Sequence, residues 1–308
     1  MASEQVYHIP ALLEQTLESL NIRPEGIYVD ATFGGGGHSR AIMERLSPAG
    51  HLYGFDQDSD ALAGALADER FTMVYSNFRF LRNFLRYYGV EAVDGVLADL
   101  GVSFHHFDDA ERGFSFRADA RLDLRMNRQG GLSAVEVVND YSEEQLADVI
   151  YLYGELQSAR RIARAVANAR RTEAITTVNQ LITVAEPLLD RRRAKKELAC
   201  LFQALRIEVN GELDALKQFL SQTAEVIAPG GRLAIITYHS LEDRLVKNFL
   251  RTGNFAGKVE TDLYGRSERP FRPLGSKPIV ADNAEVERNP RSRSAKLRVA
   301  ERENIQQQ

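Results

Sequence analysis

The sequence predicts an α/β protein with a doubly wound, Rossmann-like parallel sheet and an inserted all-helical domain. From residue 27 to residue 100, short apolar runs alternate with segments of helical periodicity, which is the pattern of strands joined by crossover helices. Four consecutive glycines follow the first apolar run, where a nucleotide-binding sheet makes its first turn from strand to helix. From about residue 104 to residue 212 the strand pattern stops and only helical periodicity remains.

The first part of the sheet is expected to contain four strands. Three strand–helix repeats and a new strand are what a parallel sheet requires. A helix with its apolar residues on one face precedes them and stops before Pro24. The expected strands are 27–30, 51–56, 71–76 and 95–100, and the expected helices are 12–20, 38–46, 58–68 and 80–88.

The insertion and the end of the sheet follow. The insertion is expected to contain helices 133–139, 142–151, 157–171, 177–186 and 197–210. The sheet then resumes with helix 212–227, a turn at 229–231, strand 232–237, helix 241–250 and two strands near 278–280 and 295–300. We therefore expect one domain formed by residues 1–103 and 213–308, and a second formed by residues 104–212.

Composition narrows the class of protein. A chain of 308 residues with 44% hydrophobic residues can form a sizeable core. No run approaches the roughly 18 apolar residues of a membrane span, and the opening segment lacks the pattern of a signal peptide. We expect a cytoplasmic protein with no membrane partner. Cys200 is the only cysteine, which excludes an internal disulfide and a cysteine-clustered metal site.

Positive charge is concentrated in two stretches, although the net charge of the chain is −4. Residues 156–206 carry a charge of +7, and residues 288–302 carry +5. Such stretches favour a polyanion partner, while the alternative is a solvated helical face. The residues that we expect to bind RNA are Arg160, Arg161, Arg164, Arg191, Arg192, Arg193, Lys195, Arg291 and Arg293.

The charges around the glycine turn indicate which nucleotide binds there. A dinucleotide fingerprint needs a third glycine where this chain has Ser39 or Arg40. Asp30 would repel a pyrophosphate but attract an ammonium or sulfonium group, and S-adenosylmethionine (SAM) carries both. Asp56 stands where a carboxylate binds ribose hydroxyls, a feature that would suit NAD equally well. The alternative is that the glycines only make a tight turn and that Asp30 caps the loop.

Nine motifs between residues 7 and 301 resemble those of the bacterial rRNA small subunit methyltransferase H family, also called MraW. In chain order they are HIPALLEQ, DATFGGGGHSRAI, GFDQD, ADLGVS, ERGFSFRADARLDLRM, RRIARA, FQALRIEVNGEL, PGGRLAIITYHSLEDRLVKNF and NPRSRSAKLRVAE. The resemblance implies a class I SAM-dependent methyltransferase that methylates the exocyclic N4 amine of a cytidine in the decoding centre of 16S rRNA. The partner would be 16S rRNA in the small ribosomal subunit, and we expect a monomer or homodimer.

The resemblance also implies which residues hold SAM. In this chain they are Gly36, Gly37, His38, Asp56, Phe78, Asp99 and His106. Two positions depart from the family pattern, since Phe104 replaces a serine and His106 replaces a glutamine. An imidazole cannot offer the donor and acceptor of an amide in the same geometry. Nearby histidines and aspartates could instead suggest a metal site, but methyl transfer to nitrogen requires no metal, so we expect none.

The chemistry points to three candidate catalytic residues. Asp99 is expected to accept an N–H hydrogen bond as positive charge develops on N4, although it could instead only bind SAM. Tyr238 and His239, together with Phe104, stand at strand ends where they could hold a cytosine removed from its stack. Phe78 could lie against the adenine of SAM or belong to the hydrophobic core.

Two other functions remain possible from the sequence. A nicotinamide-dependent oxidoreductase is disfavoured by the incomplete glycine fingerprint and by Asp30. A non-catalytic RNA-binding assembly factor is disfavoured by the intact glycine loop, Asp56 and Asp99. Residue chemistry does not choose between cytosine in RNA and cytosine or adenine in DNA, so that choice depends on the family resemblance.

Overall fold

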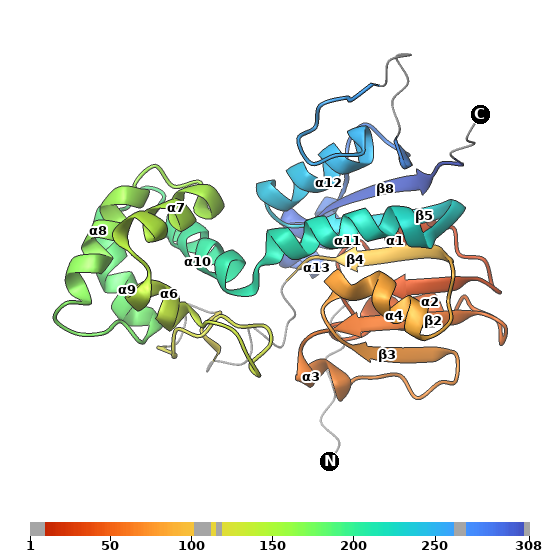
Figure 1. The fold of residues 1–308 in the computed structure, drawn as a ribbon, viewed down its shortest axis with the longest axis horizontal. Helices are drawn as coiled ribbons and strands as arrows, with labels where there is room; N and C mark the ends of the chain where they lie inside the picture. Colours follow the sequence, from red (N-terminus) through yellow and green to blue (C-terminus); the bar gives the residue numbers. More distant parts are fainter. Residues whose placement is uncertain (1–9, 102–111, 115–118, 262–268, 305–308) are drawn as a thin grey trace. The chain divides into compact units, whose positions relative to one another are not determined.

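The computed structural model describes residues 10–101, 112–114, 119–261 and 269–304. The chain divides into two compact units, drawn in Figure 1. One unit, here called the sheet unit, takes its residues from 1–101 and 214–308, and the other, the helical unit, from 102–213. That each unit is a domain with its own part in the function stays a proposal.

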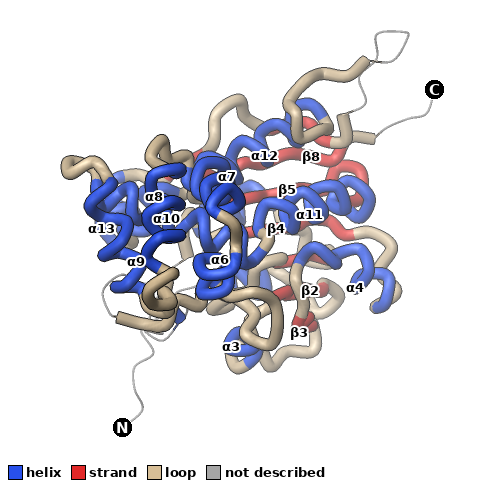
Figure 2. The backbone as a smooth tube through the Cα atoms, turned by 60° about the vertical axis from the view of Figure 1, so that its left-hand side comes forward, coloured by secondary structure: helices blue, strands red, loops and turns tan. Residues whose placement is uncertain are grey.

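The sheet unit contains a sheet with strand order β3-β2-β1-β4-β5-β8-β6, with β7 paired to β8. The bounds are β1 Ile27–Asp30, β2 His51–Asp56, β3 Phe71–Tyr75, β4 Val93–Asp99, β5 Ile227–Thr237, β6 Phe271–Pro273, β7 Ile279–Val280 and β8 Lys296–Arg302. Strands β1 to β5 are parallel, whereas β8 runs antiparallel to its neighbours. Figure 2 shows β2, β4, β5 and β8 within this unit. The predicted doubly wound sheet is confirmed.

Helices cover both faces of this sheet. Their bounds are α1 Leu13–Leu20, α2 Gly37–Met43, α3 Ser59–Leu62, η1 Phe78–Phe80, α4 Leu81–Tyr87, α11 Glu212–Val226, α12 Ser240–Thr252, α13 Asn283–Arg288 and η4 Pro290–Ser294. Side chains alternate across β1, so that Val29 packs with residues of α4, α11 and α12, and Tyr28 packs with residues of α1, α2 and α3. The sheet is therefore buried on both faces, as parallel sheets are.

Several details differ from the prediction. The expected turn at 229–231 lies inside β5, because the pairing of β5 with β4 shifts from Val93↔Ile227 to Gly95↔Arg232. The expected helix 58–68 is wrong beyond α3. Gly64 weakens a helix there, and Asp68 accepts the Arg70 backbone N–H instead. Strand β6 and helix α13 were not predicted, and α2 is shorter than the expected helix 38–46.

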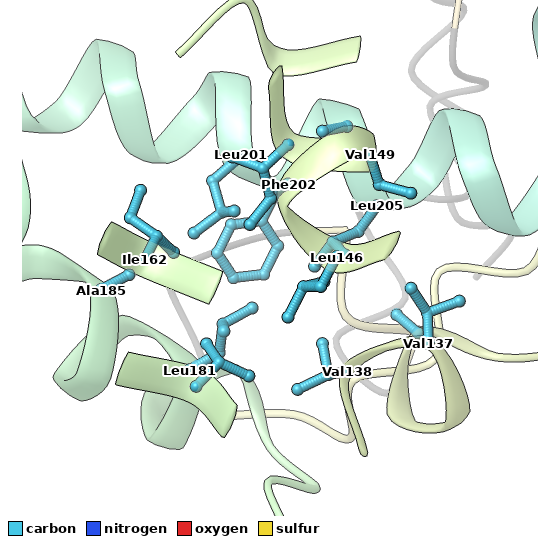
Figure 3. Packing of buried hydrophobic residues seen from close by; sticks show 14 of the residues in the cluster. Val137, Val138, Leu146, Val149, Ile162, Leu181, Ala185, Leu201, Phe202 and Leu205 are labelled. Carbon is cyan, nitrogen blue, oxygen red and sulfur yellow. The ribbon is translucent and has the colours of Figure 1, made fainter. Parts of the chain in front are cut away.

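The helical unit contains the five helices expected from the sequence. They are α6 Ala134–Asp140, α7 Glu143–Gly154, α8 Ala159–Ala169, α9 Val178–Ala185 and α10 Ala194–Asn210, with the short η3 Glu186–Leu188. Capping boxes begin α6, α7 and α9, at Ser133, Ser142 and Thr177. Figure 3 shows Leu146, Ile162, Leu181 and Phe202, from four different helices, in the buried cluster of this unit.

Candidate active site

The carboxyl ends of β1 and β4 meet where the strand order of the sheet reverses. Asp30 ends β1 and Asp99 ends β4. The Ala31 N–H donates to the Leu97 carbonyl at 2.8 Å, and the Asp99 N–H donates to Thr32 Oγ1 at 2.6 Å. Ligands of doubly wound sheets bind at such a switch point, so these two strand ends define the candidate site.

The glycine loop is attached to the end of β2. One oxygen of Asp56 accepts the Gly34 N–H at 2.8 Å, and the other accepts the Asp58 N–H at 2.8 Å. Gly36 caps α2 with a φ of 73°, and a Cβ there would lie 2.7 Å from the Phe33 ring. Only glycine fits this position without strain. The fold therefore brings the predicted Asp56 and Gly36 to one loop, with Gly37 as the first residue of α2.

Asp30 lies beneath this loop. It is 1% exposed, and its carboxylate accepts hydrogen bonds from Ser39 Oγ at 2.7 Å and from the Thr32 N–H at 3.1 Å. Burial raises the pKa of Asp30. These contacts agree with the alternative in which Asp30 caps the loop, and direct binding of a cation by Asp30 stays a prediction.

Asp99 and Tyr238 are hydrogen-bonded to each other. The Tyr238 hydroxyl donates to the Asp99 carboxylate, and the Gly101 N–H donates to Asp99 Oδ1 at 3.3 Å. Burial, opposed by these hydrogen bonds and assisted by the negative Glu242, raises the pKa of Asp99 to about 6. Burial and the Asp99 charge raise the pKa of Tyr238, so its hydroxyl stays a donor. The structure thus brings two of the three predicted catalytic residues together.

His38 also lies near Asp99. Its Nδ1 is 3.9 Å from Asp99 Oδ2, and its side chain is 6% exposed. Burial lowers the pKa of His38, so the ring is neutral at pH 7. The Ala11 backbone, which interacts with the ring, opposes this fall in pKa only in part, and the buried Nε2 has no hydrogen bond of good geometry among the described residues. An unsatisfied buried nitrogen costs folding free energy unless a ligand or water completes it.

His239 has a structural position at the start of α12. It is the N-cap residue, and its Nδ1 accepts the Glu242 N–H at 3.4 Å. Its Nε2 lies 3.0 Å from Glu242 Oε1, although the angle there is not that of a hydrogen bond. Since its side chain is 10% exposed, little of the ring is available to a cytosine. Its catalytic role stays a prediction.

Glu242 was not predicted as a site residue. It is 3% exposed, and its Oε2 accepts the Tyr238 N–H at 3.0 Å. The sequence contained one signal, because a glutamate three residues after a helix N-cap commonly reaches back to the backbone at the helix start.

The other residues predicted to bind SAM or the cytosine give less information about the site. The Phe78 ring packs edge-on against Phe219, with ring centroids 5.1 Å apart, and contacts the hydrophobic core. This agrees with the core alternative, while stacking on adenine stays a prediction. His106 and Phe104, with the neighbouring histidine and aspartates, lie outside the described residues.

The predicted RNA-binding residues are exposed. Arg160, Arg161 and Arg164 lie on α8, opposite its buried Ile162 and Val166. Arg191, Arg192 and Arg193 precede α10, and Lys195 lies in its first turn; all four are exposed. Arg291 and Arg293 are exposed residues of η4. Arg164 lies 3.4 Å from Glu143, so part of its charge is compensated.

Other cations in the same two stretches stabilise the fold. Arg170 donates to the Val138 and Tyr141 carbonyls at 2.6 Å. Arg206 forms a two-bond pair with Glu212, and Arg298 forms one with Asp243. Charge counted along the sequence therefore overstates the positive charge that is available to RNA.

No helix in the described parts of the chain has the length and apolar character needed to span a membrane.

Comparison with known proteins identifies the family. The family model described as the MraW methylase family matches residues 5–303. A protein of Parabacteroides distasonis named ribosomal RNA small subunit methyltransferase H is 59% identical, covering 97% of this chain and 98% of that protein. A protein of Phocaeicola vulgatus with the same name is 58% identical, covering 97% and 99%.

A solved structure, described as an rRNA methylase from Streptococcus thermophilus, aligns with 94% of this chain and 93% of that chain at 14% identity, with a TM-score of 0.38. The fold assignment depends on the strand order and not on this likeness. The family match and the relatives instead establish a SAM-dependent enzyme. The chain belongs to the MraW methylase family and is a class I methyltransferase.

Proposed function

We propose that this methyltransferase transfers a methyl group from SAM to the exocyclic N4 amine of a cytidine in the decoding centre of 16S rRNA. The observation that supports the methyl-transfer chemistry is the position of the Asp99 carboxylate, which is held by Tyr238 at the switch point of the sheet. Relatives named ribosomal RNA small subunit methyltransferase H support the substrate, and the family resemblance supports N4 as the position.

The residues at the switch point fit SAM. Among the described residues, the carboxyl ends of β1, β2 and β4 supply carboxylates and no lysine or arginine that would favour a pyrophosphate, and Asp56 faces the glycine loop where a ribose would lie. The buried His38 Nε2, which has no hydrogen bond of good geometry among the described residues, offers one polar contact to a ligand. We propose that Gly36, Gly37, His38, Asp56, Phe78 and Asp99 hold SAM, with Asp30 supporting the loop from below. His106 stays a further candidate.

Bound SAM supplies an electrophilic methyl group on a positively charged sulfur. The protein must then orient the N4 amine, whose lone pair is delocalised into the cytosine ring, in line with that methyl group. Asp99 accepts one N–H of the amine and so stabilises the positive charge that develops on nitrogen. As the bond between N4 and the methyl group forms, the bond between that methyl group and the sulfur would break and leave a neutral thioether. Asp99 accepts the proton that the cationic N4 then loses. Tyr238 keeps the carboxylate in place by donating its hydroxyl.

The exposed cations of the helical unit and of η4 are proposed to bind the phosphates of the rRNA. Phosphate contacts position a nucleic acid without reading its sequence, so the choice of cytidine depends on the site that holds the base. We propose the small ribosomal subunit as the substrate and the cytoplasm as the location, with the protein acting as a monomer or homodimer.

The test is methylation of small ribosomal subunits with isotope-labelled SAM, followed by mass spectrometry of 16S rRNA nucleosides. We expect labelled N4-methylcytidine in RNA and none in a DNA oligonucleotide of the same sequence. Label on another base or in DNA would refute the target, and RNA binding without transfer would support the non-catalytic assembly factor.

A further inference from the structure

Glu242 is a buried acidic residue beside the candidate site for which the proposed chemistry has no role so far. It is the third residue of α12, which follows the end of β5 at Thr237. Glu242 is 3% exposed. Its ion-pair partner among the described residues is His239, and not a lysine or arginine. A buried carboxylate without a permanent cation costs folding free energy, so its place here requires a reason.

Both oxygens of Glu242 face residues proposed for catalysis. Oε2 accepts the Tyr238 backbone N–H at 3.0 Å, and Oε1 lies 3.0 Å from His239 Nε2. Tyr238 donates its hydroxyl to Asp99. The Tyr238 ring in turn lies against Gly101, where a Cβ would be 2.8 Å from Cε2 of the ring. Glu242 therefore holds the backbone of the residue that holds Asp99.

Helix capping alone does not explain this position. Glu136 occupies the equivalent third position of α6 and accepts the Ser133 N–H at 2.7 Å, as in an ordinary capping box. Glu136 is half-buried and lies near the positive Arg125. Glu242 is buried near a second carboxylate, Asp99. Like charges in a buried site repel each other. A neutral glutamine could cap the helix without this repulsion, so capping does not explain why a glutamate is present.

We propose that Glu242 is a positioning residue for methyl transfer, which fixes the Tyr238 backbone and thereby sets the Tyr238 hydroxyl on the Asp99 carboxylate. This inference rests on the proposed function. The charge of Glu242 also favours the cation that develops on N4 when Asp99 accepts its N–H.

The charged and titratable groups around Asp99 determine how strongly the charge of Glu242 affects the pH profile of the reaction. Within the sheet unit, Asp99 faces His38 from α2, Asp30 from β1, Tyr238 from the turn after β5, and Glu242 from α12. Tyr238 also faces Glu285 of α13. Of these neighbours, Glu242 is one that a single substitution can neutralise while leaving the Tyr238–Asp99 hydrogen bond intact.

Two substitutions separate the effect of the length of the Glu242 side chain from the effect of its charge. Glu242→Gln keeps an acceptor for the Tyr238 N–H and removes the charge, so the acid limb of the single-turnover rate profile should move to lower pH. Glu242→Asp keeps the charge but is too short for the Tyr238 N–H. Its single-turnover rate at saturating SAM and RNA should fall about tenfold to a hundredfold, with SAM affinity within about twofold of wild type.

Glu136→Gln and Glu136→Asp are the matched controls, because Glu136 is also the third residue of its helix and accepts a backbone N–H at the helix start, away from the site. They should lower the melting temperature at most and leave the rate and its pH profile unchanged. If the Glu242 variants behave like the Glu136 variants, Glu242 only caps α12 and the inference is overturned. Either Glu242 variant decides this alone if the other fails to fold. A wild-type protein that forms no N4-methylcytidine would instead refute the proposed function.

Discussion

The hydroxyl of Tyr238 is hydrogen-bonded to the carboxylate of Asp99, which joins the turn after β5 to the end of β4. Gly101 makes this contact possible, because a Cβ at that position would lie 2.8 Å from the tyrosine ring. The same residue donates its N–H to Asp99 Oδ1 at 3.3 Å. The carboxylate therefore accepts hydrogen bonds from two neighbouring residues, and its protonation state should control the reaction.

The first prediction concerns the rate of methyl transfer at Asp99. Asp99→Asn keeps the shape but removes the charged acceptor, which should cost on the order of 3 kcal/mol of barrier, or about a hundredfold in single-turnover rate. Since the pKa of Asp99 is raised to about 6, the wild-type rate should rise with pH through that value and then level off. Asp99→Asn should lose this acid limb.

Rates are best measured at saturating SAM and RNA, because that condition separates catalysis from binding. A variant that transfers methyl at the wild-type rate there, with only weaker SAM binding, would show that Asp99 binds the donor and does not act on the amine. The turn from Tyr238 to Ser240 would then be the place to look for an acceptor.

The second prediction concerns stability. The folded-state pKa of Asp99 lies above its ordinary value of 3.8, so the native state binds more protons than the unfolded state between pH about 4 and 6. Its contribution to stability is therefore greatest below this window and is lost as pH rises through it. Asp99→Asn should stabilise the protein at pH 8, by about 1 to 3 kcal/mol at most, and have less effect at pH 4.

Thermal unfolding at both pH values tests this expectation. Asp214→Asn is the control, since Asp214 is 72% exposed in its side chain and should change stability little at either pH. A destabilised Asp99→Asn at pH 8 would mean that the charge is favourable in the fold, contrary to the raised pKa.

The sequence was sufficient to place the strand ends of the site. An apolar run that closes on an acidic residue shows where a strand stops, and parallel strands bring their carboxyl ends to one edge, so Asp30, Asp56 and Asp99 could be placed together. The position of β8 between β5 and β6 could not be predicted. It depends on pairs such as Leu233↔Ala300, which are far apart in the chain.

The contacts within the site could not be predicted for the same reason. Periodicity does not show that Glu242 is buried against Tyr238, or that Ser39 and Thr32 already occupy the Asp30 carboxylate. Charge counting could not distinguish Arg206, which is paired with Glu212, from an arginine exposed to solvent. Burial and pairing follow from the fold and are absent from local sequence patterns.

The third prediction is that Asp56 contributes to SAM binding. Asp56→Ala removes a charged acceptor for ribose hydroxyls and also the acceptor of the Gly34 N–H, so the glycine loop loses one attachment. The loss should be about 1.5 to 3 kcal/mol per hydrogen bond at most, measured by calorimetry with SAM. Asp56→Asn keeps one acceptor oxygen and should lose less. An unchanged dissociation constant in both variants would remove Asp56 from the site.

The fourth prediction concerns the exposed run Arg191, Arg192 and Arg193. These side chains precede α10 and are exposed, so they can reach phosphates without rearrangement of the core. Replacing all three with glutamine should weaken RNA binding and lower the slope of log affinity against log salt, because fewer counterions are released on binding. SAM affinity should not change.

A control variant that loses three positive charges elsewhere distinguishes a specific RNA contact from a general effect of net charge. Three exposed cations of the sheet unit serve for this triple substitution to glutamine, namely Arg45, Arg86 and Lys247. Binding of a 16S rRNA fragment, measured at several salt concentrations, should respond to the arginine run more strongly than to this control. Equal slopes for both variants would mean that Arg191 to Arg193 are a solvated surface, and Arg160, Arg161 and Arg164 on α8 would be the next residues to test.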